Sequence, residues 1–183
     1  MIRELKEDGT ELFLSSFSCE RNQDIEDFLR HKAIEFAKQS ISTTHVVLSK
    51  NAGGLQIAGY FALAIKNLFI DERNIPSSEW KRRVGRFGEL YQDLKGYVIP
   101  TPLIAQLSKN DFSPISGDEL IRLAFDKVAE LQRNFSGKIV YLECSDEPKL
   151  IDFYKRNRFR KITSEKTDIR GEPLVQMICY LCE

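Results

Sequence analysis

The second half of the chain alternates apolar runs with amphipathic segments, and this alternation constrains the fold more than any other feature. The run YVIPTPLIAQLS is followed by a helical pattern, GDELIRLAFDKVAELQRNF, and then by KIVYLECS. The last run is almost continuously apolar, as in a strand that helices cover on both faces. Because a long helix joins the two runs, we expect parallel strands connected by a right-handed crossover.

Other segments extend this arrangement on both sides. DEPKLIDFYKRN predicts a helix, and RFRKITS and PLVQMICYLC predict two strands. In the first half, ELFLSSF, THVVLSK and LQIAGYFALAI predict strands, the last two joined as a hairpin by NAGG. Residues 22–39 predict a helix capped by Asn22 or Asp24. The predicted fold is α/β (α+β): a mixed, mostly antiparallel sheet of about six to seven strands, flanked by helices, with a central parallel pair.

The overall composition narrows the class of protein. The 183 residues predict one domain, 1–183, with a polar insertion at about 66–97. The 27 basic and 27 acidic residues cancel, which disfavours non-specific nucleic-acid binding. MIRELKEDG is too charged for a secretory signal, no apolar run is long enough to span a membrane, and the four cysteines form no metal-binding pattern. We expect a cytoplasmic protein with reduced thiols and without a metal.

Several motifs resemble the GNAT superfamily of acyl-CoA-dependent N-acetyltransferases. LIDFYKRNRF is similar to that family's FYEKxGF, with Phe153, Tyr154 and Phe159 matching and Arg158 in place of the usual glycine. QLSKNDFSPISGDELI stands where the family has its pyrophosphate loop, (Q/R)xxGxG/A. FSCERNQDIEDFLRHKA and GYFALAI resemble segments of a branch that includes toxins acetylating aminoacyl-tRNA, and LIAQLSKN with ISGDELI resembles small acetyltransferases on mobile elements of Gram-positive bacteria. The resemblance covers the chain outside the insertion.

The resemblance implies that the loop before the long helix binds the pyrophosphate of acetyl-CoA. Gly117 falls on the last glycine of the motif, Ile115 on the earlier glycine and Phe112 on the Gln/Arg position. The first backbone N–H groups of a helix have no partner inside it, so they can bind an anion. The expected donors are the amides of Ile115, Ser116, Gly117, Asp118 and Glu119. The alternative is a capping box, because Ser116 and Glu119 fit the pattern S-x-x-E.

The implied reaction is acetyl transfer to an amine, and it assigns roles to residues elsewhere. Tyr154 holds the position of the tyrosine that protonates the leaving thiolate, with packing as its alternative role. An N–H near Leu107, Ser108 or Lys109 would bind the thioester oxygen. Glu143 is the candidate base, with a hydrogen bond or salt bridge to a neighbouring strand or loop as its alternative role.

The acceptor is not defined by the sequence. SSEWKRRVGRFGELYQDLKGY interleaves basic and aromatic residues, either for nucleic-acid contacts or as an amphipathic helix packed through Trp80, Val84 and Phe87. The expected acceptor is an amine on a small molecule, a protein or an aminoacyl-tRNA. The last would make the protein a toxin of a toxin–antitoxin system. A non-catalytic acyl-CoA-binding module and a homodimer are further hypotheses.

Overall fold

The computed structural model describes residues 7–51, 54–167 and 171–181. The chain divides into two compact units, which we describe separately. Unit 1 comprises residues 1–64 and 104–126, and unit 2 comprises residues 65–103 and 127–183.

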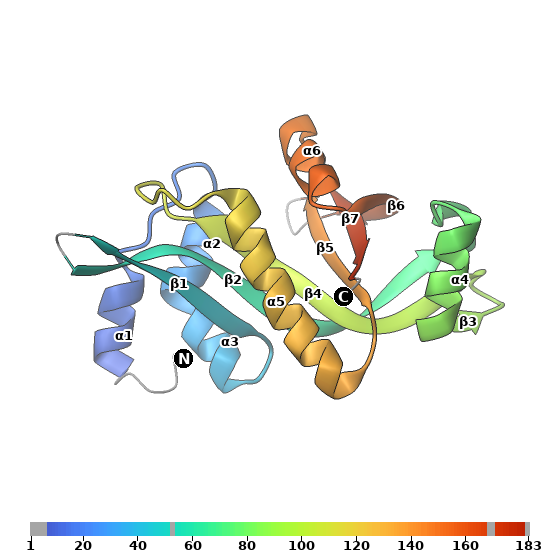
Figure 1. Cartoon of the computed structure of the whole chain (residues 1–183), viewed down its shortest axis with the longest axis horizontal. Helices are drawn as coiled ribbons and strands as arrows, with labels where there is room; N and C mark the ends of the chain where they lie inside the picture. The colour runs from blue at the N-terminus through green and yellow to red at the C-terminus, as the bar shows by residue number, and fades with distance from the viewer. Residues whose placement is uncertain (1–6, 52–53, 168–170, 182–183) are drawn as a thin grey trace. The chain divides into compact units, whose positions relative to one another are not determined.

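The described strands form a seven-stranded sheet with the order β1-β2-β4-β5-β7-β6, and β3 pairs with β4 (Figure 1). The β1–β2, β3–β4, β5–β7 and β6–β7 pairs are antiparallel, and β4 and β5 form the parallel pair. The strands are β1 (Thr43–Asn51), β2 (Gly54–Asp71), β3 (Glu89–Tyr91), β4 (Gly96–Lys109), β5 (Ile139–Ser145), β6 (Arg160–Thr167) and β7 (Pro173–Tyr180). The predicted fold class is confirmed.

The helices flank these strands. They are α1 (Glu7–Leu14), α2 (Gln23–Asp27), the π-helical turn η2 (Phe28–Lys32), α3 (Ala33–Lys38), the 3₁₀ turn η3 (Glu72–Asn74), α4 (Ser78–Phe87), α5 (Gly117–Phe135) and α6 (Pro148–Arg156). The helical segment predicted over residues 22–39 is therefore present, and its cap is Asn22, whose side chain accepts a hydrogen bond from the N–H of Ile25.

In unit 1, α1, α2 and α3 cover one face of β2, and the first turns of α5 lie on the other (Figure 1). The helices bury Phe17, Phe28 and Leu29 against Tyr60 of β2, whose hydroxyl donates to the carbonyl of Ile25 over 2.6 Å. The adjacent Gly59 faces the opposite way, toward Leu120 of α5. The helix-covered hairpin therefore holds the start of α5 in place.

The expectation of a strand at ELFLSSF is wrong, because the chain forms α1 there. Thr10, Leu14 and Phe17 are buried, whereas Leu12 is 76% exposed. Burial at intervals of four and three residues matches a helix and the turn that follows it, not the two-residue period of a strand. The short alternation of apolar and polar letters was a misleading signal.

Unit 2 has its own core, formed where α4 packs on the sheet. Trp80 and Val84 of α4 are buried with Tyr97, Tyr141 and Ile178 of the strands. Ser77 caps this helix, since its side chain accepts from the N–H of Trp80. The amphipathic interpretation of SSEWKRRVGRF is thus confirmed.

Residues 66–97 contain more regular structure than the predicted polar insertion suggests. β2 continues to Asp71, and η3, α4 and β3 follow before β4 begins at Gly96. Gly96 is required here because a β-carbon would lie 2.5 Å from the ring of Phe69 and 2.7 Å from the carbonyl oxygen of Ile70. The segment therefore packs closely on the end of β2.

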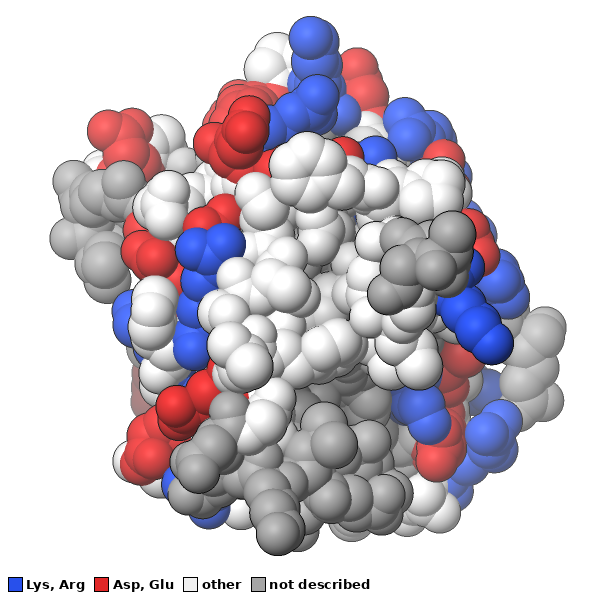
Figure 2. Space-filling model, turned by 90° about the vertical axis from the view of Figure 1, so that its left-hand side faces the viewer, with Lys and Arg blue, Asp and Glu red and all other residues white. Residues whose placement is uncertain are grey.

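Charge is mixed on the surface that Figure 2 presents, the side on which α1 and the β1–β2 hairpin lie in Figure 1. Uncharged side chains occupy its centre, and basic and acidic side chains share its edge. This agrees with the neutral balance of the whole sequence. Among the described residues, no helix combines the length and apolar character needed to cross a membrane.

Candidate active site

The loop of residues 110–116, between β4 and α5, is anchored to the neighbouring strand β2. The N–H of Asn110 donates to the carbonyl of Ala58 over 2.9 Å, and its side-chain oxygen accepts from the N–H of Phe112 over 3.2 Å. Gly59 permits this approach, because a β-carbon there would lie 2.9 Å from the carbonyl oxygen of Ser108. The start of the loop is therefore fixed by backbone packing.

Asp111 ties the same loop to the segment that precedes α2. Its carboxylate accepts from the Ser18 hydroxyl over 3.2 Å and from the N–H of Glu20 over 2.8 Å, while its own N–H donates to the carbonyl of Ser18 over 3.1 Å. Asp111 is not among the site residues predicted from the sequence. A carboxylate in a turn was the available signal, but nothing in the sequence indicated that residues 18–20 lie beside it.

The start of α5 uses some of the predicted phosphate donors internally. The N–H of Ile115 donates to the Ser113 hydroxyl over 3.2 Å, and that of Glu119 to the Ser116 hydroxyl over 3.1 Å. The second bond is the serine half of the predicted capping box. Within residues 7–51, 54–167 and 171–181, the N–H groups of Ser116 and Gly117 have no acceptor. These two amides are the best placed of the predicted donors to receive an anion.

The two residues that differ from the glycine-rich motif, Ile115 and Phe112, differ in burial. Ile115 is buried, with 9% of its surface exposed, whereas Phe112 is 78% exposed. The isoleucine side chain therefore packs into the interior and does not project from the loop into solvent. The ring of Phe112 is exposed to solvent at the position where the family motif has an amide or a guanidinium side chain.

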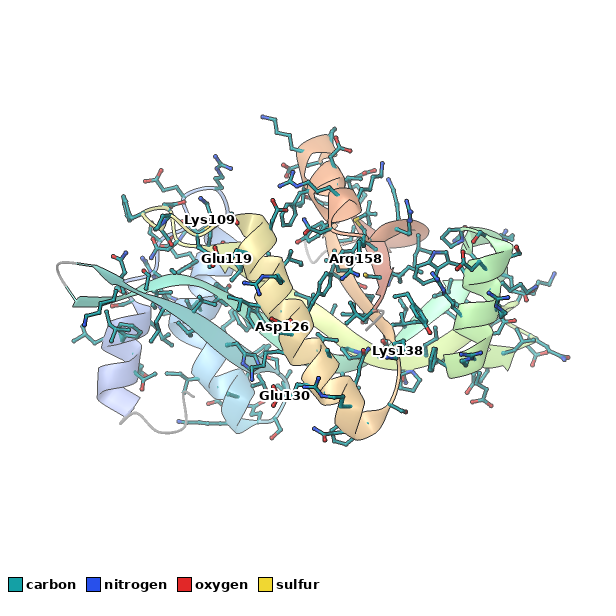
Figure 3. All side chains as sticks on the ribbon, viewed as in Figure 1. Lys109, Glu119, Asp126, Glu130, Lys138 and Arg158 are labelled. Carbon is teal, nitrogen blue, oxygen red and sulfur yellow. The ribbon has the colours of Figure 1, made fainter. Side chains whose placement is uncertain are left out.

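Charged side chains of both signs lie near the start of α5. Figure 3 shows Lys109 at the end of β4 and Glu119 in the first helical turn, at the same end of unit 1. Asp118 and Glu119 are exposed, so they can turn toward solvent. Ser108, one residue before Lys109, donates its hydroxyl proton to Cys19 Sγ over 3.3 Å, and Leu107 is half-buried on the same strand.

Tyr154 lies in α6 of unit 2 and is 7% exposed. Its ring packs edge-on against Phe153 and Phe159, with centroid separations of 4.9 and 5.6 Å. Burial, and then the nearby Cys144 thiol, raise the pKa of the tyrosine hydroxyl above its ordinary value. Tyr154 therefore stays protonated at neutral pH, as a proton donor must.

The C-terminal end of α6 fixes the position of Tyr154. The N–H of Phe159 donates to the carbonyl of Tyr154 over 3.0 Å, and that of Arg158 to the carbonyl of Lys155 over 3.0 Å. These two bonds and the Tyr154–Phe159 ring contact form a Schellman motif. The motif places Arg158 in the left-handed region, with φ of 71°. This conformation explains why the related motif has glycine at this position.

Glu143 is half-buried on β5, and its carboxylate accepts from the side chain of Gln176 over 2.8 Å. Gln176 lies directly opposite on β7 and is 2% exposed. The alternative role of Glu143, a hydrogen bond to a neighbouring strand, is therefore present. Glu143 also acts on Tyr141: burial raises the pKa of that tyrosine to about 12, and the nearby carboxylate adds to the effect.

The predicted base and the predicted acid lie on different faces of β5. Successive side chains of a strand point to opposite faces, so Glu143 and Cys144 diverge. Cys144 is the neighbour of Tyr154, and Glu143 shares its face with Tyr141. Burial, and then Asp146, raise the pKa of the Cys144 thiol to about 11, which disfavours the thiolate form at neutral pH.

The described cysteines are not exposed at the surface. Cys19, Cys144 and Cys179 are buried and form no disulfide among the described residues. Within the described ranges, no group of three or more His, Cys, Asp or Glu side chains is arranged to hold a metal ion. Cys182 lies outside these ranges.

The chain is similar in structure to bacterial toxins. AtaT complexed with acetyl-methionyl-tRNAfMet is 17% identical, with a TM-score of 0.66 over 91% of this chain and 86% of that chain. A tyrosine-to-phenylalanine mutant of KacT is 15% identical, with a TM-score of 0.65 over 89% of this chain and 85% of that chain. An AtaT mutant bound to the C-terminus of the antitoxin AtaR and acetyl-CoA is 16% identical, with a TM-score of 0.60 over 89% and 83%.

No protein-family model and no curated protein matches the sequence. At the identities of the structural matches, the likeness shows the fold, and it agrees with the GNAT-like architecture expected from the motifs. Activity does not follow from the fold alone.

Proposed function

We propose that the protein is an acetyl-CoA-dependent N-acetyltransferase of the cytoplasm. The observation that carries this proposal is the similarity of about nine-tenths of the chain to AtaT, which has been solved with acetyl-CoA and with acetyl-methionyl-tRNAfMet. The anchored loop before α5 and the protonated Tyr154 are the local features that fit such chemistry.

In this proposal the pyrophosphate of acetyl-CoA binds to the start of α5. The N–H groups of Ser116 and Gly117 donate to phosphate oxygens, and the positive end of the helix adds to the attraction. Lys109 supplies a compensating charge at the end of β4. Asp118 and Glu119 turn toward solvent, since a carboxylate beside the phosphates would weaken binding.

The reaction is direct transfer from sulfur to nitrogen. The neutral amine attacks the thioester carbonyl carbon, a C–N bond forms, and the electrons of the carbonyl move onto oxygen. An N–H near Leu107, Ser108 or Lys109 stabilises that oxygen, and the C–S bond then breaks. We propose that Tyr154 donates its proton to the departing thiolate and that water takes the proton of the attacking nitrogen. Glu143, the predicted base, lies on the other face of β5 from Tyr154, so we assign the proton to water.

A turnover assay tests the proposal. Release of free CoA thiol from acetyl-CoA is measured across amines, peptides and aminoacyl-tRNA. Tyr154→Phe is expected to lower turnover by roughly 10²–10⁴-fold, the usual contribution of a general acid. Tyr141→Phe is the matched control, because it removes the hydroxyl of another buried tyrosine with a raised pKa on the other face of β5.

The outcomes separate the enzyme from a binding module. Thermal stabilisation by CoA without turnover on any acceptor would indicate that the protein is a non-catalytic acyl-CoA-binding module and not an enzyme. No stabilisation at millimolar CoA would contradict both. Equal losses in Tyr154→Phe and Tyr141→Phe would remove the acid role from Tyr154.

The second candidate makes the acceptor an aminoacyl-tRNA. It is favoured by the AtaT complex with acetyl-methionyl-tRNAfMet, which has the highest TM-score of the structures described above. Expression is then expected to arrest growth, and Tyr154→Phe to abolish the arrest. Acetylation of small amines at rates matching or exceeding those for aminoacyl-tRNA would argue against this acceptor. The segment of residues 66–97 leads into β4, and we propose that it shapes the acceptor pocket.

A further inference from the structure

A basic cavity lies wholly within unit 2. It has a volume of about 460 Å³, in the range of roughly 300–1,000 Å³ typical of small-molecule sites. Its walls come from the end of α4, the last turns of α5, the link before β5 and the end of β7. Arg86, Arg133 and Lys138 line it together with Phe87 and Tyr180, and no aspartate or glutamate is among its described lining residues.

Two cations of the cavity lack, among the described residues, the ion pairs that two other basic residues of α4 form. On α4, Lys81 pairs with Glu72 over 3.1 Å and Arg83 with Glu79 over 2.6 Å. In contrast, neither Arg86 nor Arg133 forms an ion pair within the part of the chain that the structure describes.

The C-terminal carbonyls of α5 explain only part of this charge. They attract a cation such as Arg133. They do not account for Arg86, which belongs to α4, or for Lys138, which directly precedes β5 (Figure 3). The same cavity therefore receives cations from three separate segments.

Two of the remaining lining residues are aromatic. The rings of Phe87 and Tyr180 lie 6.3 Å apart between centroids, and the guanidinium of Arg83 packs 4.5 Å from the centre of the Tyr180 ring. This contact holds the tyrosine ring in position. The Tyr180 hydroxyl has no hydrogen-bond partner among the described residues, so it can bond to a ligand.

We propose that this cavity binds a nucleotide. Guanidinium groups bind phosphate oxygens in a two-pronged geometry, and aromatic rings stack on bases. Arg86, Arg133 and Lys138 bind the phosphate, while Phe87 and Tyr180 contact the base. A carboxylate ligand would pair with the cations but would make no stacking contact with the aromatic rings. The lining residues all belong to unit 2, whereas the loop proposed to bind CoA pyrophosphate belongs to unit 1.

Isothermal titration of the full chain with 5′-AMP at saturating CoA tests this site. Arg86→Ala and Arg133→Ala are each expected to weaken AMP binding by at least about tenfold, the loss of one charged hydrogen-bonding group. Arg82→Ala is the matched control, since Arg82 is an exposed arginine of α4 that does not line the cavity. Arg86→Gln and Arg133→Gln repeat the test with longer side chains if either alanine variant unfolds.

Titrations with fragments of the nucleotide measure the contributions of its phosphate and its base separately. Ribose 5-phosphate and adenosine are each expected to bind more weakly than AMP. A short single-stranded RNA that competes with AMP would identify a nucleic-acid strand as the source of the nucleotide, and failure to compete would identify the free molecule.

Three results would overturn the proposal: no AMP binding at millimolar concentration in the presence of saturating CoA, equal binding by the arginine variants and the wild type, or ribose 5-phosphate binding as tightly as AMP. None of these depends on acetyl transfer, so failure here is distinguishable from failure of the proposed enzyme activity.

Discussion

Ile115 and Arg158 both stand where the related motifs have glycine, yet the structure accommodates them in different ways. Ile115 is buried and has no positive φ, so its side chain fills space beneath the loop. Arg158 is exposed and adopts φ of 71°, a conformation that strains any residue with a β-carbon. The first replacement therefore contributes packing, and the second costs backbone strain.

The difference shows that a glycine in a motif can serve two separate needs. One is room, for a ligand or a neighbouring backbone, and the other is a left-handed backbone. A substitution at the first kind of position depends on where the new side chain points. At the second kind, the conformational cost remains whatever the side chain does.

The largest expected effect comes from restoring glycine at position 115. Ile115→Gly removes a buried side chain and loosens the loop backbone, so the free energy of unfolding should fall by about 3 kcal/mol. Urea denaturation of the full chain measures this loss. An unchanged or higher stability would show that Ile115 does not support the loop and would remove the contrast with Arg158.

Gly59 extends the comparison, because this glycine is required only for the space that it leaves to the neighbouring strand β4. It has no positive φ, but its β-carbon position is 2.9 Å from the carbonyl oxygen of Ser108 and 3.2 Å from the Cα of Lys109. Gly59→Ala should therefore push β2 away from β4 and destabilise the protein by roughly 1–3 kcal/mol. Gly9→Ala is the control, because Gly9 has nothing within 4 Å of the added carbon and lies inside α1. Equal free energies of unfolding for the two variants would show that β2 shifts to accommodate the added methyl group without a cost in stability.

The sequence predicted the strands and helices with strong periodicity, but not the contacts between distant segments. The limits of α5 agree with the prediction, because its apolar residues recur over five turns between a serine cap and a left-handed Ser136. ELFLSSF was too short to distinguish the two periods. The bonds of Asp111 to residues 18–20 join positions about ninety residues apart, and no local pattern encodes them.

The candidate site was predictable to a similar extent. A strand, a loop and a capped helix could be read from QLSKNDFSPISGDELI, and so could the alternative of a capping box. Which amides remain without an acceptor depends on the orientation of the Ser113 and Ser116 hydroxyls, which only coordinates reveal. Likewise, the strand period predicts that Glu143 and Cys144 diverge, but not that Tyr154 lies on the side of Cys144.

Ser116→Ala tests whether the cap and the proposed phosphate donors are separable. Losing the hydroxyl removes the bond from the N–H of Glu119, so the free energy of unfolding should fall by about 1 kcal/mol. The freed N–H also becomes available to an anion, so the rise in melting temperature caused by CoA should persist. Ser116→Thr keeps the hydroxyl and serves as the control. Loss of the CoA effect in the alanine variant alone would indicate that the hydroxyl itself contacts the ligand.

The smallest expected effect has the opposite sign and comes from restoring glycine at position 158. Arg158→Gly relieves left-handed strain of about 1–2 kcal/mol, while the greater freedom of glycine in the unfolded chain costs about 0.4–1 kcal/mol. The net stabilisation should be about 0.5–1 kcal/mol, or a rise of roughly 1–4 °C in melting temperature for a chain of this size.

Lys155→Gly is the matched control for position 158, because Lys155 is an exposed basic residue without a positive φ in the last turn of α6, the helix that Arg158 follows. It should destabilise the protein by about 1 kcal/mol, the ordinary cost of glycine within a helix. If both variants lowered the melting temperature, the side-chain contacts of Arg158 would outweigh its strain, and the position would resemble Ile115 after all. Opposite shifts would establish that the end of α6 retains a conformational demand for glycine that this sequence does not meet.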